Sequence, residues 1–343
     1  MLLDSVVIET IAYELPPHRV TSEELEDQLG PTMDRLGVPR GRLEDLSGIR
    51  ERRFWDAGTT ASAAGIRAGR AAIEQAGIEP TEMGCLINTS ITRDYVEPAT
   101  ACFVHEALKL PPACINYDIS NACLGFMTGI MNVGLMIETG LIRYGMVVSG
   151  DNMRDVVEAT VERLQAPDVD MQTFRDNFAT LTLGSSAVAA ILCHSDASRS
   201  HAGHTVNGFV TRASTQHNRL CIADQANMCM KTDASALLTA GCAVAKQAWD
   251  QAAQELPNWS DDQIARYAPH QVGSRHCAAV AQTLSITQSK MYLNFMSLGN
   301  IGSAAIPVSL AQAAESGHVT QGDHVALLGV GSGLNCSLMS VTW

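Results

Sequence analysis

Residues 118–134 constrain the fold of this chain more than any other stretch, because there a strand leads through a cysteine into a wholly apolar helix. Residues 114–117 predict the strand, and Ser120 and Asn121 are residue types that cap helices. Residues 124–137 are apolar on every face of a helix, small residues included. Such a helix belongs in the interior of a large protein rather than on its surface.

Cys123 lies at the start of this predicted helix. A thiol at a helix N-terminus faces the positive end of the peptide dipoles, which favours the nucleophilic thiolate. Unpaired cysteine is also among the residue types that are most often buried as plain core side chains. Position alone therefore leaves two roles open for Cys123, a reactive nucleophile and a structural core residue.

Composition limits the classes of protein to consider. A chain of 343 residues exceeds one ordinary domain, which predicts two domains or one duplicated fold. The net charge of −13 argues against nucleic acid or an anionic membrane surface as the main partner. No apolar run approaches the roughly 20 residues of a membrane span, and the first residues lack the basic region of a signal peptide. We expect a soluble, unprocessed protein.

The ten cysteines form no CxxC pair and no regular framework, and several lie in apolar runs. Reduced thiols, and hence a cytoplasmic location, are the simplest interpretation. Hydrophobic residues make up 46% of the chain and charged residues 17%, which is enough for a large core that can bury such thiols.

Helix and strand patterns alternate along the chain and recur in its second half, which predicts a duplicated α/β fold. Each copy contains a helix, a proline turn, a strand and a polar loop, followed by further matching elements. The paired segments are residues 70–90 and 248–271, 98–108 and 276–284, and 144–151 and 324–332. We therefore expect two halves, residues 1–180 and residues 181–343, with a cap segment at 152–177 inserted in the first.

This duplication places Cys123, His270 and Asn300 on equivalent loops, which a pseudo-twofold axis would bring together. His270 lies where a strand leaves the core, and Asn300 lies in a small-residue turn that opens an apolar helix. Taken singly, Asn300 also fits a helix N-cap, and most histidines are ordinary surface groups. The three together are a candidate catalytic set.

Two chemistries use cysteine, histidine and asparagine in this chain order. One is hydrolysis by a papain-like triad, in which asparagine orients histidine; its C-G-[SA]-C-[WY] motif is absent here. The other is thioester condensation, in which cysteine carries an acyl group while histidine and asparagine hold an oxyanion.

The C-terminal segment from Gly329 to Gly333 has glycine at every second position. It lacks the lysine of a phosphate-binding loop, so that interpretation is weak. Closely spaced glycines do let backbone amides approach a ligand oxygen, as an oxyanion hole requires.

Four motifs together resemble the thiolase superfamily, in its ketoacyl-ACP synthase III branch. They are Asn121-Ala-Cys-Leu-Gly-Phe, Ala268-Pro-His-Gln, Gly299-Asn-Ile-Gly-Ser-Ala-Ala-Ile-Pro and Gly329-Val-Gly-Ser-Gly. The resemblance spans nearly the whole chain. It implies an α/β thiolase-like fold, in which two duplicated βαβαβαββ halves form a five-layered αβαβα arrangement. It also implies a homodimer that uses CoA thioesters as substrates and needs no metal or other cofactor.

The same resemblance implies a role for each matching residue. Cys123 would be the acylated nucleophile, and His270 and Asn300 would donate hydrogen bonds to an oxyanion. The backbone amides of Cys123 and Ser332 would form a second oxyanion hole.

Glu97 separates this chain from most of the branch. Residues 88–101 resemble the loop of ketoacyl-ACP synthase III that crosses the dimer interface and places a large apolar residue before a proline at the partner's active site. Glu97 occupies that position here, as in the similar OleA-type thiolases, which join two fatty acyl-CoAs without decarboxylation. A simple acyl thioester must lose an α-proton to form a carbanion, so it needs a base such as this carboxylate.

The carrier site departs from the family pattern. A Trp and an Arg that clasp the CoA adenine in relatives are replaced by Arg42 and Leu46 in an ungapped match. Arg42, Arg50 and Arg53 remain as candidates for binding the phosphates of the carrier. Residues 221–230 carry methionines beside cysteines and fit either an apolar pocket or core filling.

We therefore expect a non-decarboxylative acyl-CoA condensing enzyme with an acyl-Cys123 intermediate. One alternative is decarboxylative condensation with a malonyl thioester, in which Glu97 would be idle. Another is a non-catalytic partner of a heterodimeric synthase, against which the presence of Cys123, His270 and Asn300 argues.

Overall fold

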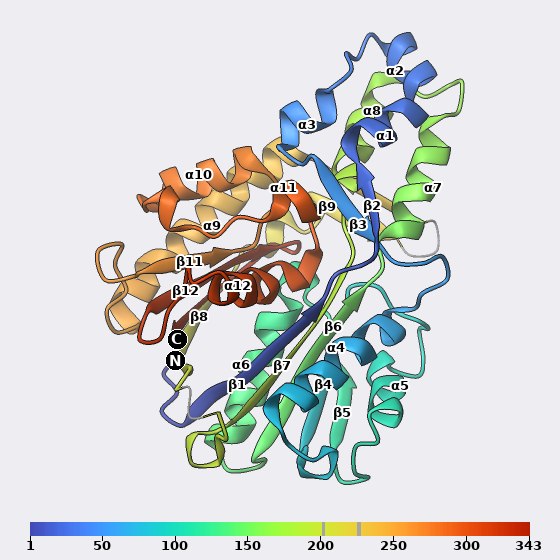
Figure 1. The fold of residues 1–343 in the computed structure, drawn as a ribbon. Helices are drawn as coiled ribbons and strands as arrows, with labels where there is room; N and C mark the ends of the chain where they lie inside the picture. The colour runs from blue at the N-terminus through green and yellow to red at the C-terminus, as the bar shows by residue number, and fades with distance from the viewer. Residues whose placement is uncertain (201–202, 225–227) are drawn as a thin grey trace.

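The computed structural model describes residues 1–200, 203–224 and 228–343. Nine strands form one large mixed sheet in the order β11-β12-β13-β8-β1-β7-β6-β4-β5 (Figure 1). They are β1 (Val6–Glu14), β4 (Cys85–Asn88), β5 (Ile115–Asp118), β6 (Tyr144–Asp151), β7 (Ser186–His194), β8 (Thr205–Ala213), β11 (Arg266–Pro269), β12 (His324–Gly331) and β13 (Asn335–Thr342). One antiparallel pair, Val7 with Thr205, joins β1 to β8 and so unites two sets of strands.

The two sets repeat one another in opposite order from that junction. Counted outward from the junction, the first set runs β1, β7, β6 and β4, and the second set runs β8, β13, β12 and β11. In each set the second strand from the junction runs antiparallel to the third, which runs parallel to the fourth. The duplicated α/β fold expected from the sequence is confirmed.

The strand β7 follows residue 180 in the chain, yet it pairs with β1 and β6 of the first set. These pairings favour a division of the chain between β7 and β8. The expected division at residues 180 and 181 stays a prediction.

Helices form three layers around the two halves of the sheet (Figure 1). Helices α4 and α5 cover the outer face of the first half, α9 and α10 cover that of the second, and α6 and α12 lie between the halves in the largest core cluster. They are α4 (Ala61–Ala76), α5 (Thr100–Ala107), α6 (Gly125–Glu138), α9 (Ala234–Glu255), α10 (Ser274–Leu284) and α12 (Ala305–Glu315). This is the predicted five-layered arrangement.

The two central helices start in the same way. The 3-10 turn η2 (Ala122–Leu124) leads into α6, and the 3-10 turn η7 (Gly302–Ala304) leads into α12. The predicted interior position of the first helix is confirmed, because Phe126, Ile130 and Val133 of α6 are fully buried. The two turns therefore meet where the halves of the molecule face each other.

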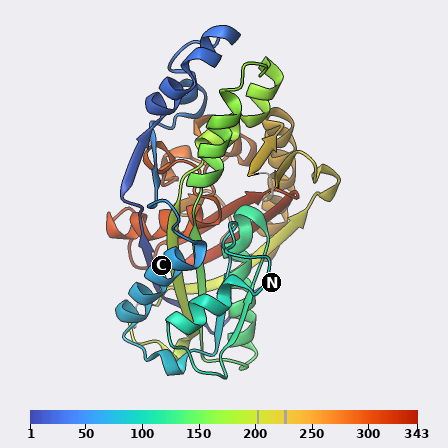
Figure 2. The same ribbon diagram turned by 90° about the vertical axis from the view of Figure 1, so that its right-hand side faces the viewer.

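A smaller cap lies beyond one end of the sheet in both views (Figures 1 and 2). Its apolar cluster joins residues 25–54 to residues 153–183, and the second strand of a hairpin, β10, packs on the helices of the later segment. Its elements are β2 (His18–Thr21), α1 (Ser22–Gln28), α2 (Gly30–Leu36), α3 (Arg42–Ser47), β3 (Glu51–Phe54), α7 (Arg154–Leu164), α8 (Met171–Asn177), β9 (Cys221–Asp224) and β10 (Cys229–Thr232). Of the methionine-bearing stretch 221–230, residues 225–227 lie outside the described residues, and Met230 packs on the cap cluster.

No helix in the described part of the chain combines the length and the apolar character that a bilayer crossing requires.

Candidate active site

Cys123 lies in the turn η2, between the end of β5 and the start of α6. Ala122, just before it, has a φ of 45°, in the left-handed region that residues other than glycine rarely adopt. The expected capping by Asn121 is wrong: its side chain donates to Thr128 Oγ1 at 2.9 Å and accepts from Asn335 Nδ2 at 2.9 Å. These bonds tie the cysteine turn to the C-terminal strand.

Burial raises the pKa of the Cys123 thiol to about 12, with smaller contributions from Cys221 and Asp151. The net lowering of this pKa expected at a helix N-terminus is therefore not found, because the loss of solvation is the largest contribution. Cys123 rests as a thiol and has to lose its proton during any nucleophilic attack.

The C-terminal glycine segment packs on the cysteine turn. Gly331 ends β12 so close to this turn that a Cβ there would lie 3.5 Å from the backbone N of Cys123. Ser332 follows at once, in the connection from β12 to β13. The structure thus brings the backbone of Gly331 to the Cys123 amide, and the oxyanion role of the Ser332 amide stays a prediction.

His270 directly follows β11, and its backbone N donates to Leu328 O at 2.7 Å. Its side chain is only 4% exposed, and its Nδ1 has no hydrogen-bond partner among the described residues. Burial, with a smaller contribution from His276, lowers the pKa of His270 to about 3. The imidazole is neutral at physiological pH and so carries one N–H donor and one acceptor nitrogen.

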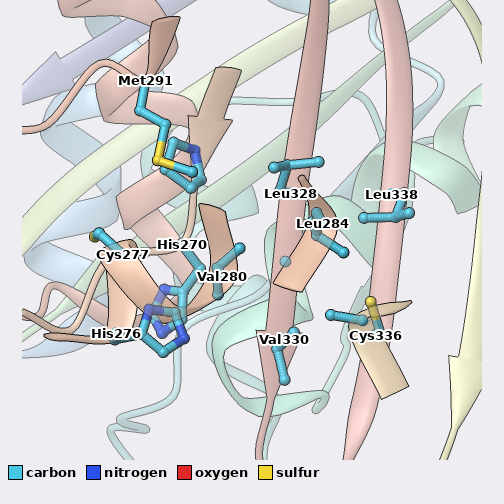
Figure 3. A pocket seen from close by; sticks show the side chains of 13 residues that line it. His270, His276, Cys277, Val280, Leu284, Met291, Leu328, Val330, Cys336 and Leu338 are labelled. Carbon is cyan, nitrogen blue, oxygen red and sulfur yellow. The ribbon is translucent and has the colours of Figure 1, made fainter. Parts of the chain in front are cut away.

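His276 of α10 lies beside His270 at the wall of a small apolar cavity, with the ring centroids 6.4 Å apart (Figure 3). Its Nδ1 also lacks a partner among the described residues. Most of the other lining side chains are apolar, among them Val280, Leu284, Leu328, Val330 and Leu338. The back of the His270 ring is thus shielded from water.

Gln271 is a positioning residue that the sequence analysis missed. Its Nε2 donates to Tyr292 O at 2.9 Å and to Ser309 Oγ at 2.8 Å, and its Oε1 accepts from Asn294 N at 2.9 Å and from Phe295 N at 3.1 Å. This buried amide therefore fixes the segment that leads to Asn300. The only signal in the sequence is its place directly after His270.

Asn300 is held by three bonds. Its backbone N donates to Thr182 O at 2.8 Å, its carbonyl accepts from Gly184 N at 2.9 Å, and its side-chain Oδ1 accepts from Gly302 N at 3.1 Å. Since the amide oxygen is occupied, the NH2 group remains as a donor. In a papain-like triad the asparagine would bind the histidine, and no such bond joins Asn300 to His270 among the described contacts.

The three predicted residues converge at the carboxyl end of β12. The turns η2 and η7 contact each other, η2 also contacts β12, and His270 is bonded to the same strand. The site thus combines a thiol with two side chains that each offer an N–H donor, as thioester chemistry through an oxyanion requires.

Glu97 lies on the loop between β4 and α5 and is exposed in the single chain. The neighbouring Tyr95 and Val96 are 60% and 90% exposed. No contact among the described residues joins Glu97 to Cys123, and the catalytic role of Glu97 stays a prediction.

The predicted carrier arginines lie on the cap. Arg42 and Arg50 are exposed and form no ion pair with the described residues, and Arg53 is half-buried and donates to Pro16 O at 3.4 Å. The backbone N of Arg50 donates to Met296 O at 2.9 Å, which places this segment beside α11 (Phe295–Leu298) near Asn300.

Arg52, between two of these arginines, has a structural role instead. It is fully buried, and it donates to Leu181 O at 2.9 Å and to Ser22 Oγ at 3.1 Å. Burial lowers its pKa to about 10, against smaller opposing contributions from nearby carboxylates.

Among the described residues, no group of His, Cys, Asp or Glu has the arrangement of a metal site.

The duplicated five-layered fold and the cysteine, histidine and asparagine at one end of its sheet define the thiolase class of condensing enzymes. Two family models match the chain: 3-oxoacyl-[acyl-carrier-protein (ACP)] synthase III over residues 117–208, and its C-terminal model over residues 255–343. Over the whole of both chains, the protein is 39% identical to the acyl-CoA:acyl-CoA alkyltransferase of Xanthomonas campestris pv. campestris. It is 38% identical to the protein of that name from Shewanella oneidensis, again over the whole of both chains.

Solved structures give the same result. Xanthomonas campestris OleA with cerulenin bound matches 100% of this chain and 98% of its own, with a TM-score of 0.97 at 39% identity. A variant of that OleA with lauric acid and lauroyl-CoA bound matches 100% of both chains, with a TM-score of 0.95 at 38% identity. The chain therefore belongs to the OleA-type condensing enzymes, acyltransferases of the ketoacyl-ACP synthase III branch of the thiolase superfamily.

Proposed function

We propose that this enzyme joins two fatty acyl-CoAs by a non-decarboxylative Claisen condensation, through an acyl thioester on Cys123. The observation that carries the proposal is the carboxylate of Glu97. Variants of Xanthomonas campestris OleA have been solved with a glutamate or a cysteine replaced, and these two positions are 26 residues apart, as Glu97 and Cys123 are. A base at this position supports proton removal rather than decarboxylation as the source of the carbanion.

The first half-reaction is acyl transfer. The sulfur of Cys123 attacks the thioester carbon of one acyl-CoA, its proton passes to the departing CoA sulfur, and the acyl group remains on Cys123. The backbone amides of Cys123 and Ser332 donate hydrogen bonds to the oxygen of the tetrahedral intermediate. The close approach of Gly331 to the Cys123 amide supports this assignment.

The second half-reaction forms the carbon–carbon bond. Glu97 takes a proton from Cα of a second acyl-CoA, and the N–H groups of His270 and Asn300 hold the enolate oxygen. The carbanion attacks the acyl-Cys123 thioester, the Cys123 sulfur leaves, and the proton returns from Glu97 to that sulfur. The product is a β-ketoacyl-CoA, or its acid after hydrolysis. Neutral His270 and the NH2 group of Asn300, which has no partner among the described residues, support this step.

The Glu97 that serves each site comes from the partner subunit of a homodimer. Its loop is exposed in the single chain together with Tyr95 and Val96, and β5 at the open edge of the sheet exposes Ile115. An apolar loop beside an unpaired strand edge supports an interface between two copies of the chain.

The acyl chain is delivered by coenzyme A, whose phosphates bind Arg42, Arg50 and Arg53 at the cap. Two exposed arginines without an ion pair among the described residues support an anionic ligand there. The enzyme acts in the cytoplasm, which its unpaired cysteines support.

The test is to incubate the pure protein with a long-chain acyl-CoA alone and to measure condensed product by mass spectrometry. Release of a β-keto product of two acyl chains supports the proposal, and Cys123→Ala is the control that should release none. A product that forms only when a malonyl thioester is added would instead assign a decarboxylating ketoacyl synthase, in which Glu97 lines the pocket.

A further inference from the structure

The loop that carries Glu97 is fixed at its start by one buried carboxylate. Backbone amides of Ile91 and Thr92 donate to Oδ1 of Asp151 at 2.7 and 2.9 Å, and the Thr92 hydroxyl donates to the same oxygen at 3.2 Å. Asp151 is the last residue of β6 and is fully buried. A rigid strand end therefore holds the loop by charge-assisted hydrogen bonds, which are stronger than bonds between neutral groups.

The other oxygen of Asp151 faces the turn that follows Asn300. Its Oδ2 accepts from Ser149 Oγ at 3.2 Å and lies 3.5 Å from Ser303 Oγ. Gly302 has a φ of 59°, in the left-handed region that favours glycine, and a Cβ there would lie 2.7 Å from Ile91 Cδ1, so the two segments touch at this position. The Asp151 carboxylate thus contacts both the loop that carries Glu97 and the turn that follows Asn300.

Asp151 has no ion pair with the described residues, so hydrogen bonds alone stabilise its charge. An unpaired buried carboxylate is costly, because the loss of solvation favours its neutral form. A neutral acceptor would satisfy the same donors at a lower cost in desolvation. The presence of a carboxylate here, where a neutral acceptor would cost less, therefore points to a need for a tightly held loop.

We propose that Asp151 is a positioning residue that holds the Glu97 loop of its own chain in reach of the partner's Cys123. This inference rests on the proposed function, because it assigns Asp151 a part in condensation and none in acyl transfer. Asp151 touches no reacting atom; it acts through the amides of Ile91 and Thr92.

Two variants separate this role from plain stability. Asp151→Ala leaves both loop amides without an acceptor, and displacement of the base by about 1 Å should lower the condensation rate roughly 100-fold. Asp151→Asn keeps a neutral acceptor at Oδ1, so the loss should be only about tenfold. The rate at which one acyl-CoA acylates Cys123, measured on the intact protein by mass spectrometry, should not fall in either variant, because Asp151 contributes only to raising the pKa of that thiol.

Glu9 offers a matched control. It is a buried carboxylate that accepts from the backbone amides of Arg199 at 2.9 Å and Ser200 at 2.6 Å, and it contacts neither the Glu97 loop nor the Asn300 turn in the described structure. Glu9→Gln and Glu9→Ala should lower stability without separating acylation from condensation.

A mixed dimer locates the effect. When one chain carries Glu97→Gln and the other Cys123→Ala, the one complete site uses Cys123 of the first chain and Glu97 of the second. Asp151→Asn should lower condensation by this mixed dimer more when it is added to the chain with the working Glu97 than when it is added to the chain with the working Cys123.

The outcomes are distinguishable. If the wild type releases no condensed product from acyl-CoA alone, the proposed function fails and this inference falls with it. If the wild type condenses acyl-CoA but folded Asp151→Ala or Asp151→Asn keeps the full rate, only this inference is overturned. A parallel loss of acylation and condensation, or a larger effect in the chain with the working Cys123, overturns it as well.

Discussion

The backbone amide of Gly302 donates a 3.1 Å hydrogen bond to the side-chain oxygen of Asn300. This bond fixes which way the Asn300 side-chain amide points. Its oxygen faces the Gly302 amide, and its NH2 group remains available as a donor. In the proposed mechanism that group holds the enolate oxygen together with His270.

Asn300→Asp tests the donor directly. The substitution keeps the oxygen that accepts from Gly302, but it replaces the NH2 donor with a second acceptor and adds negative charge beside the enolate. The condensation rate should fall by about 10²-fold to 10³-fold, as on loss of an oxyanion donor elsewhere. Acylation of Cys123, followed in the same sample by intact-protein mass spectrometry, should change much less. Equal losses in both steps would assign Asn300 a purely structural role.

The pH dependence of Cys123 alkylation follows from its pKa of about 12. Well below that pKa the thiolate fraction rises with pH, so the rate of alkylation by iodoacetamide should rise about tenfold per pH unit from about pH 7 to pH 10. Peptide mass spectrometry resolves Cys123 from the exposed Cys102 in one experiment. A rate that levels off near neutral pH would show a thiolate stabilised at the helix N-terminus and would contradict the effect of burial.

The buried His270 gives a stability prediction with a definite sign. Its pKa is about 3 in the folded protein and about 6.5 in an unfolded chain, so the unfolded state binds more protons between those values. The contribution of His270 to the free energy of unfolding is complete above about pH 6.5 and falls by about 1.4 kcal/mol per pH unit as the pH drops below it. His270→Gln should remove this share of the slope in urea unfolding measured from about pH 7.5 down to pH 4.5 and leave the share of His276, whose pKa burial lowers to about 4. If the free energies of unfolding of the variant and the wild type change in parallel with pH, the pKa of His270 is not lowered in the folded protein, and the prediction is contradicted.

Local patterns in the sequence were enough to predict the duplication and the three central residues. The cysteine turn and the Asn300 turn each lie between a polar segment and an apolar helix, and such patterns are readable without distant contacts. The strand before His270 ends at a proline, which also marks it locally. Family resemblance then added Glu97 and Ser332, whose roles the structure of one chain leaves as predictions.

Features that depend on distant contacts were missed. Asn121 reads as a helix cap, yet its partner Asn335 lies 214 positions away in the chain. The raised pKa of Cys123 results from the side chains that enclose it after folding, which outweigh the local dipoles. Asp151 is the last residue of the repeated segment 144–151, and only the loop amides that converge on it reveal its place in the site.

Glu97→Gln separates the two half-reactions. Glutamine keeps the shape of the side chain but cannot accept the α-proton, so condensation should fall by about 10²-fold to 10⁴-fold while acylation of Cys123 continues. The acyl-enzyme should therefore accumulate, and mass spectrometry of the intact protein detects it. Glu97→Asp, which keeps a base on a shorter side chain, is the matched control and should retain more condensation than Glu97→Gln. Condensation at the wild-type rate in Glu97→Gln would rule out Glu97 as the base.

The central claim is that Glu97 of one subunit removes the Cα proton of the second acyl-CoA at the site that contains Cys123 of the other subunit, and two co-expressed mixed dimers test it most directly. In the first, one chain carries Glu97→Gln and its partner Cys123→Ala; in the second, one chain carries both changes and its partner is wild type. With each mixed dimer purified by two different tags, the account predicts condensation by the first and none by the second. Activity in the second and none in the first would show that Glu97 acts within its own chain, and this result would contradict the account.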